Sequence, residues 1–102
     1  MLNIEKKAEG KNLMMTLTGR LDTTTAPDLE KEVNESIEGV ENLDFDFTSL
    51  EYISSAGLRV LLSAQKIMNK QGNMVIKNAS DEVKEIFEVT GFADILTITK
   101  KL

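Results

Sequence analysis

The stretch LDFDFTSLEYISSAGLRVLL, residues 43–62, contains a strand and a helix joined by a polar turn. From Leu43 to Phe47 apolar residues alternate with aspartates, which places the apolar side chains on one face of a strand. After the turn, Leu58, Leu61, Leu62, Gln65 and Met68 follow helical spacing and Gly72 supplies a stop, so a helix is expected over about residues 55–71. A strand followed by a helix of this kind is typical of an α/β fold.

The sequence before this stretch predicts an antiparallel hairpin. Residues 2–8 and 12–18 are strand candidates separated by Gly10-Lys11-Asn12. The motif Gly19-Arg20-Leu21-Asp22 then leaves the second strand. In the same way, we expect the third strand to end at Phe47, where the alternation of apolar and acidic residues stops.

Helices are expected on both sides of residues 43–62. Thr25 and Asp28 resemble a capping box that begins the first of them, and Gly39 ends it. The remaining expected elements alternate strand, helix and strand: residues 74–76, a helix that Ser80 caps and Gly91 ends, and residues 95–98.

The expected order of elements is therefore ββαβαβαβ, in a single domain over residues 1–102. After the first hairpin, strands and helices alternate, which predicts an α/β fold with a mixed, mostly parallel sheet, an antiparallel N-terminal strand and three helices. Working loops in such sheets lie at the carboxyl ends of the parallel strands. Two polar loops, Gly19–Asp22 and Tyr52–Gly57, should meet there.

Composition argues against several classes of function. The chain has no cysteine and no histidine, so thiol chemistry is absent and the side chain best suited to proton transfer is missing. Its formal net charge of -5 repels nucleic acid. No apolar run approaches the roughly 20 residues of a membrane span, and the first residues do not resemble a secretion signal. We expect a cytoplasmic protein that is not an enzyme and binds no cofactor.

The start of the helix at Ser55 has the properties of an anion site. A serine there can cap free backbone amides, and a phosphate on it would meet those amides and the positive end of the helix. The residues alone leave two roles open, because serine is also the ordinary choice for a helix cap and either Ser54 or Ser55 could be that cap.

Over nearly its whole length the chain resembles a STAS domain of the anti-sigma factor antagonist type. The resemblance rests on Gly19–Asp22, on the strand from Leu43 to Phe47 that leads into Leu50, and on the turn and helix from Tyr52 to Leu62. Weaker matches are residues 72–75, 83–87 and 90–92.

The resemblance implies a phosphorylation switch. In this family a protein kinase that is also an anti-sigma factor phosphorylates the serine that corresponds to Ser55 here. The unphosphorylated domain binds the kinase and frees a sigma factor, phosphorylation ends the binding, and a phosphatase could reset the switch. This sequence has Ser54 where the family usually has aspartate, which makes Ser54 an alternative acceptor. The residues expected to contact the partner are Asp22, Ser54, Ala56, Gly57 and Arg59.

Two other functions remain as alternatives. The same fold could serve as a constitutive subunit, for instance one bound to the ATPase of a transporter, in which the serine only caps the helix. A hydrolase with Ser55 as nucleophile is disfavoured because no histidine or nearby lysine could activate the hydroxyl.

Overall fold

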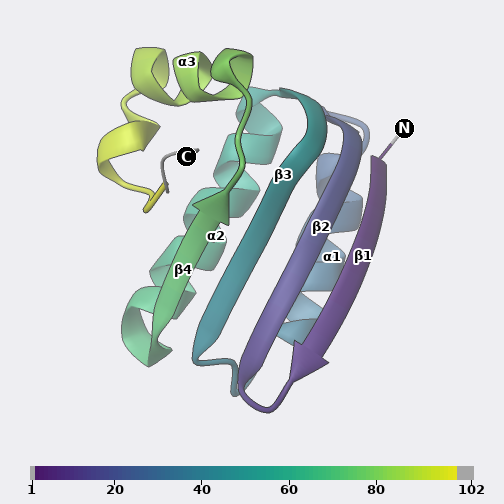
Figure 1. Cartoon of the computed structure of the whole chain (residues 1–102), viewed down its shortest axis with the longest axis vertical. Coiled ribbons are helices and arrows are strands. Elements are labelled where there is room, and N and C mark those ends of the chain that lie inside the picture. The colour runs from purple at the N-terminus through teal and green to yellow at the C-terminus, as the bar shows by residue number, and fades with distance from the viewer. Residues whose placement is uncertain (1, 99–102) are drawn as a thin grey trace.

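Figure 1 shows the computed structural model, which describes residues 2–98. Its elements are, in chain order, β1 (Leu2–Glu9), β2 (Asn12–Leu21), α1 (Ala26–Ser36), β3 (Asn42–Ile53), α2 (Ser55–Gln71), β4 (Asn73–Lys77), α3 (Asp81–Thr90) and the short 3-10 helix η1 (Phe92–Asp94). The sheet has the order β1-β2-β3-β4; β1 is antiparallel to β2, and the other pairs are parallel. The predicted mixed, mostly parallel α/β fold is therefore confirmed.

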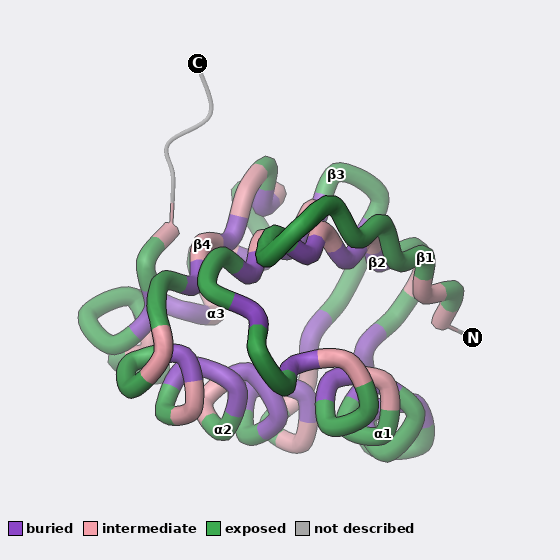
Figure 2. Tube along the Cα trace, turned by 90° about the horizontal axis from the view of Figure 1, so that it is seen from below, coloured by how far each residue is buried: buried purple, intermediate pink, exposed green. Residues whose placement is uncertain are grey.

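The core lies between the sheet and its helices. Figure 2 shows α1 and α2 together below one face of the sheet, with buried residues in both layers. The alternation predicted for β3 is confirmed, since Leu43, Phe45 and Phe47 are all buried. Helix α3 joins this core through Phe87, whose ring centroid lies 6.5 Å from that of Phe47.

The strands β2 and β3 are longer than predicted, and bulges explain the difference. Thr16 pairs with Asp46, but Thr18 pairs with Ser49, so β3 holds one extra residue over this interval. A second shift follows between Gly19 and Arg20. Because each bulge adds a residue, the buried positions of β3 change from a spacing of two to a spacing of three, which reads as broken alternation in the sequence.

The predicted ends of α1 are only partly correct. Thr25 is the N-cap of the helix, but its side chain makes no capping hydrogen bond, so the expected capping box with Asp28 is wrong. Instead the Thr25 hydroxyl accepts a hydrogen bond from the backbone N–H of Asp22 at 2.8 Å and donates one to the carbonyl of Arg20 at 2.9 Å. The helix ends at Ser36, before Gly39.

The strand predicted over residues 95–98 is not formed among the described residues. The chain turns through η1 after Gly91, and only an isolated parallel bridge joins Ile98 to Ile76. Gly91 has φ 81°, the left-handed conformation that ends a helix, as predicted for α3.

Ser80 caps α3, and its loss should be measurable. Its hydroxyl oxygen accepts a hydrogen bond from the backbone N–H of Val83 at 3.2 Å. Ser80→Ala should lower the free energy of unfolding by about 1 kcal/mol in urea denaturation. The control is Ser63→Ala, the same change at an exposed position inside α2, where alanine should stabilise slightly. An equal response of the two variants would contradict the capping role.

Candidate functional site

The structure brings the carboxyl ends of β2 and β3 together, as the sequence predicted. Leu21 pairs with Ile53, and the backbone N–H of Ser54 donates a hydrogen bond to the carbonyl of Leu21 at 2.8 Å. Leu21 and Ile53 are thus paired on neighbouring strands, and Asp22 and Ser54 are the residues that come immediately after them in the chain. The two loops that carry the predicted site residues form one edge of the sheet.

Ser54 and Ser55 have different roles at the start of α2. Ser54 is the N-cap in extended conformation, and its hydroxyl oxygen accepts a long hydrogen bond, 3.4 Å, from the backbone N–H of Gly57. Its carbonyl accepts from the N–H of Leu58 at 2.9 Å. Ser55 is the first helical residue and is exposed. Within residues 2–98 its hydroxyl has no hydrogen-bond partner, so it is available to a binding protein.

Packing inside the protein leaves no room for a side chain at Gly57. The residue is buried, and a Cβ atom built on it would lie 2.6 Å from Leu21 Cγ and 3.0 Å from Ile53 Cγ1. Such separations are shorter than van der Waals contact, so any larger residue would push the first turn of α2 away from the strand ends. Gly57 thus lets the first turn of α2, which carries Ser55, pack closely on the strand ends, whereas the sequence analysis counted it only among the expected partner contacts.

Asp22 is held within its own turn. Its carboxylate accepts hydrogen bonds from the Thr24 hydroxyl at 2.7 Å, from the Thr24 N–H at 3.0 Å and from the Thr25 N–H at 3.1 Å. The hydrogen bond from the Thr24 hydroxyl is the main cause that lowers the pKa of Asp22 below its usual value. Asp22 therefore orders the loop that adjoins the serine turn, and a contact with a partner remains a prediction.

Ala56 and Arg59 complete the set of predicted residues. Ala56 is half-buried and packs against the hydrophobic core. Arg59 is exposed and follows Ser55 by four positions, so both side chains lie on the same face of α2. In the described part of the chain, Arg59 takes part in no ion pair. The guanidinium therefore lies exposed on the same face of α2 as Ser55, and its contact with a partner remains a prediction.

A contact between Arg20 and Tyr52 borders the site and was missed from the sequence. The Arg20 guanidinium carbon lies 4.5 Å from the centre of the Tyr52 ring, a cation–π contact between two exposed side chains. The two residues are cross-strand partners. Their pairing could have been anticipated only if both strands had been predicted to continue past their bulges.

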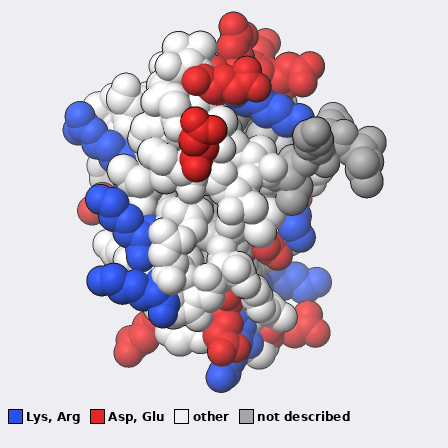
Figure 3. Space-filling view, turned by 90° about the vertical axis from the view of Figure 1, so that its left-hand side faces the viewer, with Lys and Arg blue, Asp and Glu red and all other residues white. Residues whose placement is uncertain are grey.

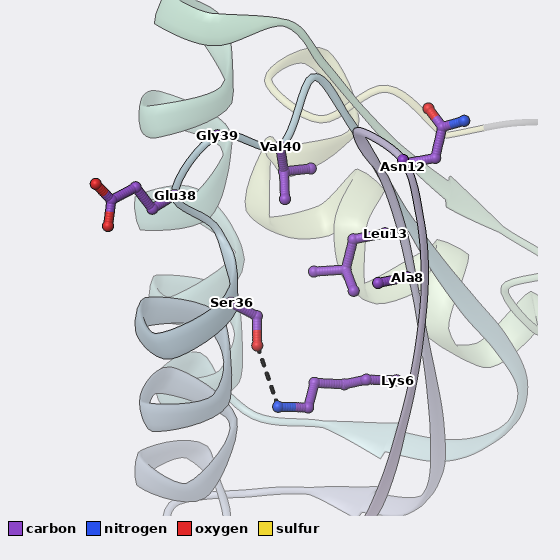
Figure 4. Close-up of a pocket in the computed structure, with 9 residues that line it drawn as sticks. Lys6, Ala8, Asn12, Leu13, Ser36, Glu38, Gly39 and Val40 are labelled. Carbon is purple, nitrogen blue, oxygen red and sulfur yellow. Dashed lines mark hydrogen bonds between the residues drawn. The ribbon is translucent and has the colours of Figure 1, made fainter.

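A separate cavity of about 380 Å³ lies at the other end of the sheet, between the β1–β2 hairpin and the end of α1 (Figure 4). Lys6 reaches across it, with Nζ 3.1 Å from the Ser36 hydroxyl and 2.5 Å from a Glu32 carboxylate oxygen. The lysine is thus already paired by its own chain. None of the residues predicted for the functional site lines this cavity.

The described residues offer no site for a metal or a membrane span. No three acidic side chains among residues 2–98 come together as metal ligands, and the sequence has no cysteine or histidine to add to them. In the same part of the chain, no helix is long and apolar enough to cross a bilayer. What the carboxyl ends of β2 and β3 present is the Ser55 hydroxyl, the Arg59 guanidinium and the ordered turn at Asp22.

Comparison with known proteins places this geometry in a family. The STAS domain model matches residues 3–102. The chain is 36% identical over 88 residues to BtrV of Bordetella bronchiseptica, covering 84% of this chain and 76% of BtrV. It is 32% identical over 96 residues to the anti-sigma-B factor antagonist of Listeria monocytogenes, covering 91% of this chain and 83% of that protein.

Solved structures share the fold. A crystal structure of an anti-sigma factor antagonist from Mycobacterium paratuberculosis superposes with a TM-score of 0.89 at 17% identity, covering 100% of this chain and 88% of that one. The anti-sigma factor antagonist SpoIIAA in its unphosphorylated form gives a TM-score of 0.75 at 16% identity, covering 100% and 90%. From the matched residues and the relatives above 30% identity, the chain belongs to the STAS domain family.

Proposed function

We propose that the protein is an anti-sigma factor antagonist that binds a kinase-type anti-sigma factor when Ser55 is unmodified and releases it when Ser55 is phosphorylated. One observation carries the proposal: Ser55 is exposed with its hydroxyl free, at the first residue of a helix, while the neighbouring Ser54 is used as the cap. The names of the curated relatives support the general role. Binding and release of the anti-sigma factor need no cofactor bound to this chain. We place the protein in the cytoplasm.

The helix start can accept a phosphate without loss of the fold. The first turn of α2 contains no acidic residue, so an anion on Ser55 would meet the positive end of the helix without a competing carboxylate. A phosphate adds about -1.5 to -2 charges at neutral pH. Because the same hydroxyl would face the partner, the added charge and bulk act on the interface and leave the core intact.

Ser54 is the weaker candidate for the phosphoacceptor. Its hydroxyl oxygen faces the N–H of Gly57, and the residue is only half exposed. For a phosphoryl group to be transferred to Ser54, its hydroxyl oxygen would have to give up the hydrogen bond that caps the helix and reach the active site of a kinase. The structure thus favours Ser55 on grounds of access, in the same register that the family resemblance implies.

The five predicted partner residues then divide by what they touch. Ser54 and Gly57 act from within, as the cap and as the small residue over Leu21. Arg59 is fully available on the exposed face of α2, and Ala56 is partly so. We assign direct partner contact to Ser55, Arg59 and Ala56, and a positioning role to the other residues.

Phosphorylation of the purified protein tests the proposal. After incubation with ATP and the cognate serine kinase, mass spectrometry should locate one phosphate on Ser55. Ser55→Ala should abolish the label, while Ser54→Ala should keep it and lower stability by about 1 kcal/mol through the lost cap. Absence of any label would contradict the proposal, and a label that disappears only in Ser54→Ala would move the acceptor to Ser54.

A further inference from the structure

Most of the net charge of the protein lies in one short segment. Residues 81–94, which form α3 and η1, contain five acidic residues and one lysine, a net charge of -4 out of -5 for the whole chain. The rest of the chain is almost balanced. Figure 3 shows the face that includes α3, where acidic side chains gather at one end beside a stretch without charged residues.

Helix stability accounts for only part of this acidity. Asp81 and Glu82 lie in the first turn of α3, where a carboxylate is favourable. Glu85 lies beyond that turn, and Glu88 lies close to the negative end of the helix, whose last turn has no basic residue. Within the part of the chain that the structure describes, none of these carboxylates forms an ion pair. An uncompensated charge that does not help the helix suggests a use outside it.

The same helix exposes apolar surface. One side of α3 has a shallow hollow of about 390 Å³, lined by Glu82, Glu85, Ile86, Val89 and Thr90. We call the surface formed by these five residues the α3 face. Val89 is 80% exposed, although valine normally helps to fill a core. Ile95, shortly after η1, is also half exposed. The spacing of these residues by three and four puts acid at the start of the face and apolar side chains at its end.

We propose that the α3 face docks a basic amphipathic helix from a partner protein, separately from the serine turn. Leucine-like side chains of the partner would cover Ile86 and Val89, and its lysines or arginines would pair with Glu82 and Glu85. A second copy of this chain is the poorer occupant, because it would bring the same acidic segment against this one. Ten residues of α3 span about 15 Å, enough to hold two to three turns of a partner helix.

A synthetic peptide can probe this surface in the full chain. The probe contains about 14 residues of leucine and lysine, with leucine at helical spacing on one face. Amide shifts in a heteronuclear NMR titration should concentrate on residues 82–95. A peptide of the same composition with scrambled order should bind at least about fivefold more weakly, because it cannot present an apolar face with basic flanks.

Variants of the protein test the charged and the apolar contributions to peptide binding separately. Glu82→Gln with Glu85→Gln, and Val89→Ser alone, should each weaken binding about threefold to tenfold. The control is Glu30→Gln, which removes one exposed carboxylate from α1 and should have no effect. Val89 is mostly exposed, so its replacement leaves the fold unchanged, and circular dichroism checks this for every variant.

Four outcomes would overturn the proposal: absence of binding, shifts that map elsewhere, equal binding of the scrambled peptide, or affinity that is insensitive to Val89→Ser. Sedimentation that shows the free protein as a dimer through α3 would replace the partner helix by a second copy. Phosphorylation of Ser55 is not involved in any of these measurements. The α3 face can therefore fail while the serine switch holds, and the reverse is equally possible.

Discussion

Replacing Ser55 by aspartate should reduce binding to the cognate anti-sigma factor by at least about 100-fold, equivalent to about 2.7 kcal/mol. The change places a carboxylate on an exposed residue whose free hydroxyl, in the proposed complex, faces the partner. An interface that accepts a hydroxyl at this point must then desolvate a charge without a matching group. Isothermal titration calorimetry with the purified anti-sigma factor measures the loss directly.

The fold should be unaffected by the same change. Ser55 is the first residue of α2, and aspartate in a first helical turn is stabilising by about 0.3 to 1 kcal/mol. The melting temperature of Ser55→Asp should therefore be equal to that of the wild type or slightly higher. Ser55→Ala is the matched variant, since it also removes the hydroxyl but adds no charge, and it should keep most of the binding.

The result separates the switch from a constitutive role. If Ser55 served only to begin the helix, Ser55→Asp would bind nearly as well as wild type, and the protein would act as a permanent subunit of some other complex. If both variants lost binding equally, the hydroxyl itself would be the contact and charge would not matter. Only a large difference between aspartate and alanine supports control by phosphate.

The sequence predicted the parts of this site that depend on local rules. A serine cap at Ser54 or Ser55 and a helix over about residues 55–71 follow from residue type and apolar spacing, and the structure has the helix with Ser54 as its cap. The meeting of the Asp22 and Ser54 loops followed from the expected parallel order of β2 and β3, which is also confirmed. The cap and the helix were inferred from residues close together in the sequence, and the meeting of the two loops from a general rule of sheet topology.

Features that depend on exact register were not predictable. The bulges between Asp46 and Ser49 and beside Tyr52 disrupt the alternation on which strand assignment relies, so β2 and β3 were expected to end too early. The contact of Arg20 with Tyr52 and the packing of Gly57 on Leu21 exist only because the strands continue. Local pattern cannot show which residues of two strands lie side by side after an insertion.

Replacing Gly72 by alanine should destabilise the protein by about 3 kcal/mol or more, the upper end of the cost of overpacking. Gly72 joins α2 to β4, and a Cβ atom on it would overlap the backbone carbonyl oxygen of Glu41. That carbonyl accepts a hydrogen bond from the N–H of Asn73 at 2.8 Å, at the first pair of the β3–β4 ladder. Backbone cannot rotate away as a side chain can, so the ladder itself must shift.

Gly10→Ala provides the comparison that isolates this clash. Gly10 has φ 61° in the β1–β2 hairpin, and a Cβ atom there would meet nothing within 4 Å. Its replacement costs only backbone strain, about 1 to 2 kcal/mol. Urea denaturation of both variants should therefore show Gly72→Ala as clearly the less stable. Equal losses would mean that the β4 edge adjusts freely around Glu41, in which case the junction of α2 and β4 is softer than its close backbone contact implies.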